Sequence, residues 1–194
     1  KEVQMGNHGT TTFYGDELLT NGDMEDSFSA GVASGWAKDA GSGGTFSQET
    51  TIVHGDSNAQ KIALSNEYYL FDQLNLSVTQ GRVYRLSGWI RSSVAFTAGL
   101  GLYDNAWSAV TGSTGTDTWT YFEKIFTANT TVANAWIRVS INGNALNTCN
   151  VYIDDVSLKE VGVADGWTTA DAEPLIPQTA LMGMSKPMVF DGVD

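Results

Sequence analysis

The sequence is poor in several residue types, and each shortage excludes a class of protein. A single cysteine, Cys149, excludes an internal disulfide, and we expect a small buried apolar side chain there rather than a reactive thiol. Lys and Arg total 10 against 22 Asp and Glu, and the net charge of -12 argues against a nucleic acid or an anionic membrane as partner. No apolar run reaches the roughly 18 residues of a membrane span. No signal peptide opens the chain, and because the first residue is Lys1 we expect a leader or a preceding region to be missing.

Proline is also scarce, with 3 residues, whereas glycine is common, with 21. Threonine, serine and asparagine are frequent and the β-branched residues occur in short runs, a composition typical of antiparallel β-structure. No helical periodicity persists for two turns in the body of the chain. With 194 residues, of which 42% are hydrophobic, the chain can bury one sizeable core. We therefore predict an all-β protein, an antiparallel β-sandwich with extended N- and C-terminal segments.

A bulged strand is predicted near the end of the patterned region. Residues 151–158 read VYIDDVSL, and their apolar positions alternate, slip by one residue at Asp154 and Asp155, and then alternate again. Two carboxylates inside a buried strand are costly to desolvate unless a cation meets them. Residues 18–25, LLTNGDME, supply further oxygen ligands. The alternative is that Asp154 and Asp155 only accept hydrogen bonds from a turn.

Three further segments repeat one alternating pattern. Residues 83–90 (VYRLSGWI), 96–104 (FTAGLGLYD) and 135–142 (AWIRVSIN) each place apolar side chains on one face and Trp, Tyr, Arg or amide side chains on the other. We predict that the apolar face of each strand packs in the core. The inward residues are Tyr84, Leu86, Ile90, Phe96, Ala98, Leu100, Leu102, Ile137, Val139 and Ile141.

The outward residues of these strands suggest carbohydrate as a ligand class. Sugars present C–H faces ringed by hydroxyl groups, which suit aromatic platforms flanked by planar hydrogen-bonding groups. Gly99 and Gly101 would leave a groove floor, and Trp107 lies in a predicted loop, at the groove rim or as a cap over the core. We predict one concave sheet with Arg85, Trp89, Tyr103, Trp107, Trp136, Arg138 and Asn142 as ligand-binding residues. These residue types also anchor protein interfaces, so packing against a terminal segment or a neighbouring subunit is an equal alternative.

Residues suited to catalysis are few and scattered. The run His54-Gly55-Asp56-Ser57 contains the residue types of a catalytic triad, but a triad converges in space, and four consecutive residues around Gly-Asp indicate a turn. His8 stands among Gly and Asn and is expected to be solvated. We predict that the chain is not an enzyme.

Five short motifs in order carry a family resemblance. They are LLTNGDME (18–25), GW (35–36), GRVYRLSGWI (81–90), TWTYF (118–122) and VYIDDVSL (151–158). Together they resemble the non-catalytic, calcium-containing carbohydrate-binding modules with a jelly-roll fold that occur beside xylanases and glucanases. The similarity covers residues 18–161. The opening and closing motifs are fairly specific for this fold and say little about the ligand.

The resemblance also implies a structural calcium ion. By position, Glu25 of the opening motif and Asp154 of the closing strand would hold it. Backbone carbonyls and Asn21, Asp23 or Asp155 would complete the shell. Oxygen ligands without clustered His or Cys favour Ca²⁺ over zinc or iron.

The resemblance divides the chain into an N-terminal arm (1–17), a module (18–161) and a C-terminal linker or docking tail (162–194). The tail holds all 3 prolines and ends in MVFDGVD. This phrase resembles the first strand of laminin-G-like domains, so we expect the start of a second module or a strand donated to a neighbour.

Both terminal segments are similar to segments of bacteriophage structural and fibre proteins. We therefore predict an adhesion or decoration domain on the virion surface or outside the cell. It would bind glycans and, through its terminal segments, coat subunits, as a homo-oligomer or part of a larger assembly. The alternative is an accessory carbohydrate-binding module of a secreted polysaccharide-degrading enzyme.

Overall fold

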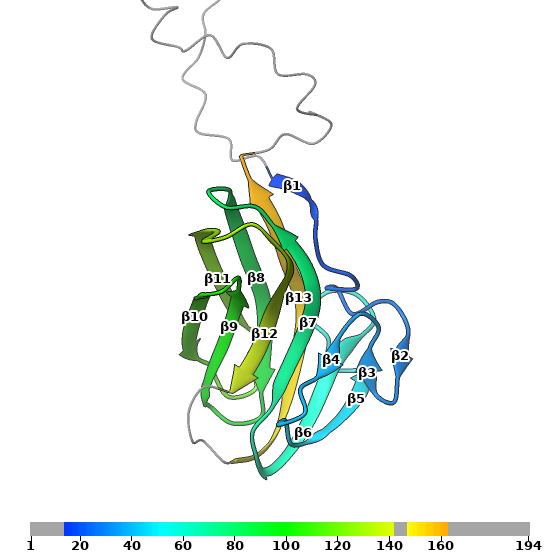
Figure 1. Ribbon diagram of the computed structural model, residues 1–194. Helices are drawn as coiled ribbons and strands as arrows, with labels where there is room; N and C mark the ends of the chain where they lie inside the picture. Colours follow the sequence, from blue (N-terminus) through cyan, green and yellow to red (C-terminus); the bar gives the residue numbers. More distant parts are fainter. Residues whose placement is uncertain (1–13, 142–146, 163–194) are drawn as a thin grey trace, which may run out of the picture.

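The computed structural model describes residues 14–141 and 147–162, which fold into two large antiparallel sheets packed face to face (Figure 1) and one small two-stranded sheet, Phe28–Ser29 with Val32–Ala33. The strands are β1 (Tyr14–Glu17), β2 (Phe28–Ser29), β3 (Val32–Ala33), β4 (Ala37–Lys38), β5 (Thr45–Glu49), β6 (Ala59–Glu67), β7 (Leu70–Val78), β8 (Val83–Ser92), β9 (Thr97–Tyr103), β10 (Trp107–Ser113), β11 (Thr120–Thr127), β12 (Val132–Ile141) and β13 (Asn147–Val161). The first sheet has the order β11-β8-β13-β6-β5, with β1 beside β13, and the second sheet has the order β10-β9-β12-β7-β4. The prediction of an all-β antiparallel sandwich is confirmed. The described ranges hold no helix with the length and apolar character that membrane crossing requires.

The core between the sheets contains the inward residues that the alternation predicts. Cys149 is also buried, as predicted, and burial raises the pKa of its thiol. The side chain of Ile141 lies outside the described part of the structure. The confirmed inward residues are Tyr84, Leu86, Ile90, Phe96, Ala98, Leu100, Leu102, Ile137 and Val139.

The predicted β-bulge in β13 is confirmed. Asp154 pairs with Trp89 of β8, whereas Ser157 pairs with Ser87, so β13 carries one extra residue between these two pairs. Asp155 adopts a left-handed φ of 49° within this bulge. The slip allows apolar residues on both sides of the bulge to face the core.

Gly22 is the point where the opening segment, residues 18–25, meets β13. Its carbonyl accepts a hydrogen bond from Val156 N at 2.8 Å. A Cβ added here would lie 2.0 Å from the Val156 carbonyl oxygen, so only glycine fits. On the other side, Gln73 of β7 accepts from Thr20 N at 2.8 Å and donates to Thr20 O at 2.7 Å. The opening segment is therefore bonded to both sheets.

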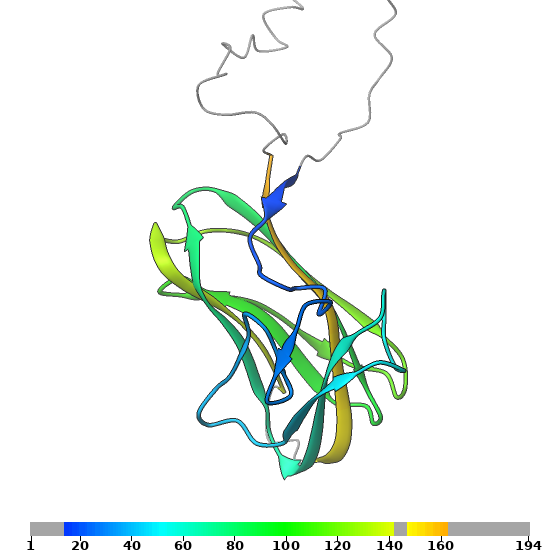
Figure 2. The same cartoon turned by 90° about the vertical axis from the view of Figure 1, so that its right-hand side faces the viewer.

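Strand β1 extends the sandwich into the segment predicted as an arm. Tyr14 pairs with Val161 and Glu17 pairs with Lys159, so β1 runs beside the end of β13 (Figure 2). The predicted boundary at residue 18 falls just after this pairing. The other predictions for residues 1–13 and 163–194 lie outside the described residues.

Candidate functional site

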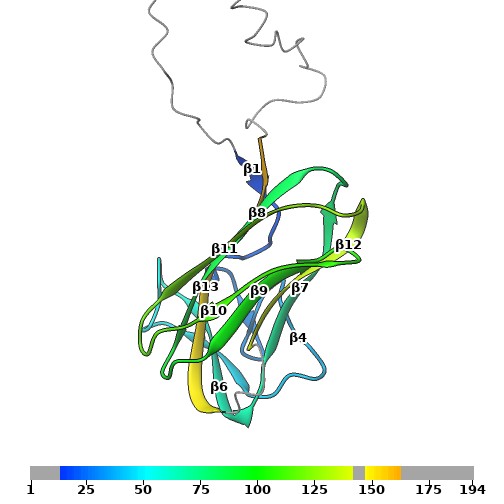
Figure 3. The same ribbon diagram turned by 90° about the vertical axis from the view of Figure 1, so that its left-hand side faces the viewer.

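The outer face of the second sheet carries an aromatic row of Tyr103, Trp107 and Trp136. Strand β9 lies between β10 and β12 (Figure 3), and the register pairs Tyr103 of β9 with Trp107 of β10 and with Trp136 of β12. Ring centroids lie 5.4 Å apart for Tyr103 and Trp107, 5.3 Å for Tyr103 and Trp136, and 4.7 Å for the two tryptophans. A tight connection at Asn105, with φ of 77°, joins β9 to β10. Trp107 is therefore the first residue of β10 rather than a loop residue, which corrects the prediction, and 46% of its surface is exposed.

Next to the aromatic row lies a glycine floor formed by Gly99 and Gly101. Gly101 is in register with Ala109 and Arg138, and Gly99 is in register with Thr111 and Ser140. The missing side chains leave a hollow of about 180 Å³ over β9 and β10. It is lined by Gly99, Leu100, Gly101, Trp107, Ala109, Thr111, Arg138 and Ser140.

Arg138 also lies on this face, and it is held by two carboxylates. Its Nε and Nη2 donate to Asp72 of β7 at 2.8 and 2.6 Å, and Nη2 also contacts Asp39. The guanidinium carbon lies 4.6 Å from the centroid of the Trp136 ring. Burial raises the pKa of the Asp72 carboxyl, which is 4% exposed, although Arg138 opposes this change. The hydrogen bonds to Asp72 raise the pKa of Arg138, which stays charged.

A second hollow, of about 380 Å³, lies on the other side of Arg138. Lys38, Asp39, Leu74 and Trp136 are among its walls. The aromatic row and Arg138 thus adjoin hollows on both sides, one floored by glycine and one beside a charged edge. We refer to this whole surface as the second-sheet face.

Arg85 and Trp89 lie on the outer face of the other sheet. Both belong to β8 of the first sheet, whereas Tyr103 and Trp136 belong to the second. The prediction that they share one concave sheet is therefore wrong. Alternation along a strand decides which side chains face outward, but a sandwich has two outward faces and the pattern is the same on both. Asn142 lies outside the described residues.

On the first sheet these two residues are already engaged by neighbours. The His54 ring stacks on Trp89 with centroids 4.0 Å apart and an interplanar angle of 20°. Tyr121 of β11 packs against Trp89 at 5.0 Å. Arg85 Nε donates to Glu123 at 2.6 Å, and Arg85 also donates to the Tyr121 hydroxyl. A loop therefore covers this face where Trp89 lies.

Asp154 anchors that loop. Its Oδ2 accepts from His54 N at 2.8 Å and its Oδ1 accepts from Asp155 N at 2.9 Å. Asp155 Oδ2 lies 2.6 Å from His54 Nδ1. Burial raises the pKa of the Asp154 carboxyl to about 6, and the charge of Asp155 adds to this, while hydrogen bonds from backbone N–H groups act in the opposite direction. A cation beside Asp154 would favour its ionised form.

Glu25 binds the far end of the same loop. Its Oε1 accepts from Ser57 N at 2.8 Å and Asn58 N at 2.7 Å, and its Oε2 accepts from Asn58 Nδ2 at 3.0 Å. Glu25 and Asp154, which are 129 positions apart in the chain, therefore hold residues 54–58 from two ends. The run predicted to be a turn is a loop fixed by carboxylates.

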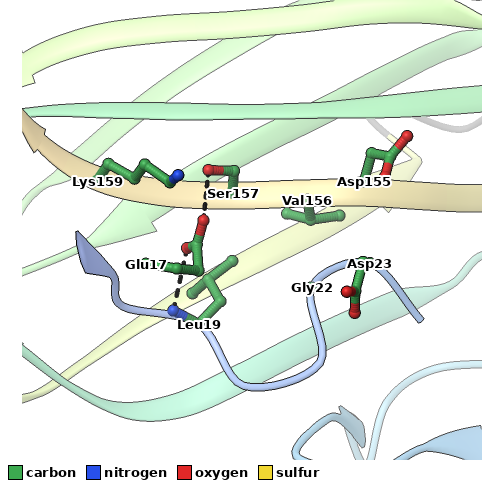
Figure 4. Close-up of a pocket in the computed structure, with 8 residues that line it drawn as sticks. All are labelled: Glu17, Leu19, Gly22, Asp23, Asp155, Val156, Ser157 and Lys159. Carbon is green, nitrogen blue, oxygen red and sulfur yellow. Dashed lines mark hydrogen bonds between the residues drawn. The ribbon is translucent and has the colours of Figure 1, made fainter. Parts of the chain in front are cut away.

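The other metal candidates have separate positions. Asn21 adopts a φ of 51°, and its Oδ1 accepts from Asp26 N at 2.8 Å, which gives it a role in the turn. Asp23 and Asp155 line an open hollow of about 320 Å³ between the opening segment and β13 (Figure 4). Within residues 14–141 and 147–162, no group of three or more His, Cys, Asp or Glu is arranged to hold a metal ion. Two carboxylates with backbone carbonyls remain a donor set that calcium accepts.

Sequence reasoning missed three of these acidic residues. Asp72 offered a signal, because it is a charged residue inside the apolar strand LFDQLNLSV, and a buried charge requires a partner. Asp39 and Glu17 lie in polar segments without such a signal. Glu17 joins the opening segment to β13, because it accepts from Leu19 N at 3.1 Å and from Ser157 Oγ at 2.6 Å (Figure 4). It also accepts from Leu158 N at 2.8 Å.

A family model described as carbohydrate binding domain matches residues 16–146. The match extends over all the described residues of the second-sheet face. No curated protein matches the chain.

Solved structures with the same fold are similar at low sequence identity. The xylan-binding domain CBM22-1 from Paenibacillus barcinonensis is 12% identical, with 78% of this chain and 99% of that chain covered and a TM-score of 0.58. An arabinose-bound α-L-arabinofuranosidase is 16% identical, with 74% and 26% covered and a TM-score of 0.59. The enzymatically active domain of tailspike protein 4 of bacteriophage CBA120 is 15% identical, with 74% and 21% covered and a TM-score of 0.56. The chain thus spans 26% of the length of the arabinofuranosidase and 21% of the length of the tailspike domain.

Proposed function

Because the chain belongs to the carbohydrate-binding domain family, we propose that its second-sheet face is a non-catalytic glycan-binding surface. The family and the jelly-roll fold that the short motifs imply are confirmed. The ligand is a polysaccharide or a glycan chain. Family membership supports binding rather than turnover, and the scattered His and Cys residues agree with that.

One observation carries this proposal: the aromatic row stands beside the glycine floor on one face. An aromatic ring stacks on the C–H face of a sugar. The hydroxyl groups around the rim of the sugar ring then remain free to bond with planar donors. Arg138 supplies such a donor between the two hollows. On the described part of the first sheet, the Trp89 ring is instead stacked against His54.

We also propose that Glu25 and Asp154 hold a structural calcium ion together with backbone carbonyl oxygens. Asp154 supports this, because a carboxylate that is 1% exposed and has a pKa raised to about 6 is stabilised by a nearby cation. The ion would fix the loop of residues 54–58 to β13. It would have no part in contacting the glycan.

For the wider role we propose an adhesion or decoration domain of a phage virion, located on the virion surface or extracellularly. Its terminal segments would contact coat subunits, in a homo-oligomer or a larger assembly. Similarity in fold to a domain of the CBA120 tailspike supports this role. So does the resemblance of both terminal segments to phage structural proteins.

A second candidate is an accessory module of a secreted polysaccharide-degrading enzyme. The fold similarity to an α-L-arabinofuranosidase, of which the chain covers 26%, favours it. Native mass and affinity electrophoresis separate the two roles. A symmetric assembly of the full chain supports decoration, whereas a monomer that is retarded in a polysaccharide gel supports the accessory module.

A glycan array that includes xylans and arabinose-bearing polysaccharides tests the binding surface. We expect the full chain to bind and Trp136→Ala to lose binding. Tyr68→Ala is the matched control, because Tyr68 is 42% exposed and lines neither hollow of the second-sheet face. Equal binding by wild type and Trp136→Ala would contradict the proposed location.

A further inference from the structure

We infer that Asp39 and Asp72 are positioning residues that hold Arg138 over β7 and so keep the glycine floor open to the ligand. This inference rests on the proposed glycan-binding function. It concerns residues that do not themselves need to touch the sugar.

The strand register gives Arg138 two possible directions. On β12 it lies between Gly101 of β9 on one side and Asp72 of β7 on the other. All of its hydrogen bonds to the described residues go toward the β7 side, to Asp72 and to Asp39. The guanidinium group is therefore drawn away from Gly101.

The open hollow over β9 and β10 depends on this direction. A free arginine side chain has several rotamers and is long enough to lie across a neighbouring strand. Lying across Gly101, it would fill the hollow of about 180 Å³ that Arg138 borders. A mobile arginine would also lose rotamer freedom on binding, which weakens affinity. Because Asp39 and Asp72 fix Arg138 before the ligand binds, the hollow stays open and no rotamer freedom of Arg138 is lost on binding.

The fixed orientation also presents a defined donor. Nε and Nη2 are used by Asp72 and Asp39, so Nη1 is the guanidinium nitrogen with no bond to the described residues. Trp136 packs against the same guanidinium at 4.6 Å and holds its plane. A planar donor held on three sides suits a hydroxyl group of a sugar that stacks on the aromatic row.

The two carboxylates differ in a way that makes the inference testable. Asp72 lies in β7 and its side chain is 6% exposed, so replacing it also destabilises the fold. Asp39 follows β4, and its side chain is 33% exposed. Replacing Asp39 should therefore release the Arg138 side chain from its fixed orientation with little effect on the free energy of unfolding.

A double-mutant cycle on binding is the test. Dissociation constants for soluble arabinoxylan, or for the strongest array glycan, are measured by calorimetry for wild type, Asp39→Ala, Arg138→Ala and the double variant. We expect Asp39→Ala to weaken binding about three- to tenfold and Arg138→Ala about tenfold or more. The double variant should bind no more weakly than Arg138→Ala, because Asp39 acts through Arg138. Asp39→Asn, which keeps an acceptor oxygen, should be intermediate.

The outcomes separate this inference from the proposed function. If Trp136→Ala abolishes binding while Asp39→Ala is neutral, or its effect is additive with that of Arg138→Ala, the positioning role is overturned and the glycan face stands. If Trp136→Ala leaves binding intact, both proposals fail. NMR of the ligand-free protein adds a readout that needs no glycan. The Nη2 protons of Arg138, for which Asp39 and Asp72 are the acceptors, should exchange slowly with solvent in wild type and faster in Asp39→Ala, and equal rates would overturn the inference.

Discussion

The outer faces of the two sheets carry the same kinds of side chain but differ in what covers their tryptophan rings. On the first sheet His54 stacks on Trp89, and Arg85 is bonded to Glu123 and Tyr121. On the second sheet Trp107 is 46% exposed and borders a hollow floored by glycine. The difference shows that residue type alone does not mark a binding surface. What lies over the face decides whether its rings are available.

The covering of the first sheet has an identifiable cause. Asp154 and Glu25 bind the two ends of the loop at residues 54–58, and this loop places His54 on Trp89. The carboxylates proposed as calcium ligands therefore belong to the covered face. We assign stability to the first sheet and ligand binding to the second, and the following experiments test that division.

The largest effect is expected from removing two rings of the aromatic row. Trp107→Ala with Trp136→Ala should reduce glycan affinity by about thirtyfold to a thousandfold, because each stacking ring contributes on the order of 1–2 kcal/mol. Calorimetry measures the affinity, and urea unfolding serves as control. A double variant that is folded and still binds with wild-type affinity would rule out this face as the ligand site.

The next effect concerns Asp154, calcium and pH. Burial raises the pKa of Asp154 from 3.8 to about 6 in the folded protein. Between these two pH values the calcium-free folded protein therefore keeps a proton on Asp154 that the unfolded chain has lost. In excess chelator, the contribution of Asp154 to stability should be largest below about pH 4 and should fall as pH rises to about 6, by up to roughly 2–3 kcal/mol. Calcium should restore stability above that range and leave glycan affinity unchanged.

Melting curves at several pH values, with chelator and with calcium, check this prediction. Asp154→Asn is the matched variant, because it removes the titrating group and retains a similar shape. It should lose the pH dependence and the response to calcium together. Identical melting temperatures with and without chelator at pH 7 would count against the calcium site.

A single substitution on the covered face should affect stability and not binding. Trp89→Ala removes the ring on which His54 stacks and should lower the free energy of unfolding by about 2 kcal/mol. Glycan affinity should stay within about twofold of wild type. Denaturant unfolding and calorimetry on the same samples measure both. A loss of affinity without a loss of stability would place the ligand on the first sheet.

The smallest effect is expected from filling the glycine floor. A Cβ at Gly99 would lie 3.3 Å from Ser140 Oγ and 3.6 Å from a Thr111 methyl, which is a tight but tolerable fit. Gly99→Val should therefore fold and should weaken glycan binding about tenfold, since its side chain occupies the hollow. At Gly101 a Cβ would lie 2.7 Å from the Ala109 Cβ, so Gly101→Val should lower stability as well. Unchanged affinity in Gly99→Val would show that the ligand does not use the floor.

Much of the architecture was predictable because it depends on local pattern. Alternation predicted the inward residues of β8, β9 and β12, and a one-residue slip predicted the bulge at Asp155. The family resemblance came from short motifs such as residues 18–25 and residues 151–158, each of which is recognisable from its own sequence. Such signals lie within a few residues of each other in the chain.

The site was only partly predictable, because its parts come from strands far apart in sequence. Asp72 is 66 positions from Arg138, and Asp39 is 99 positions away. Nothing in either segment specifies the other partner. Trp89 and Trp136 have equivalent positions in their strand patterns, yet they face opposite sides of the molecule.

The sequence by itself determined that this chain forms a β-sandwich, which side chains of each strand enter the core, and where β13 must bulge. These follow from the two-residue period of a strand and from the cost of burying polar groups. Only the tertiary structure decided which strands share a sheet, which aromatic face a loop covers, and which carboxylates hold Arg138. Sheet order and loop packing are set by long-range contacts, and a local pattern contains no information about the partner strand.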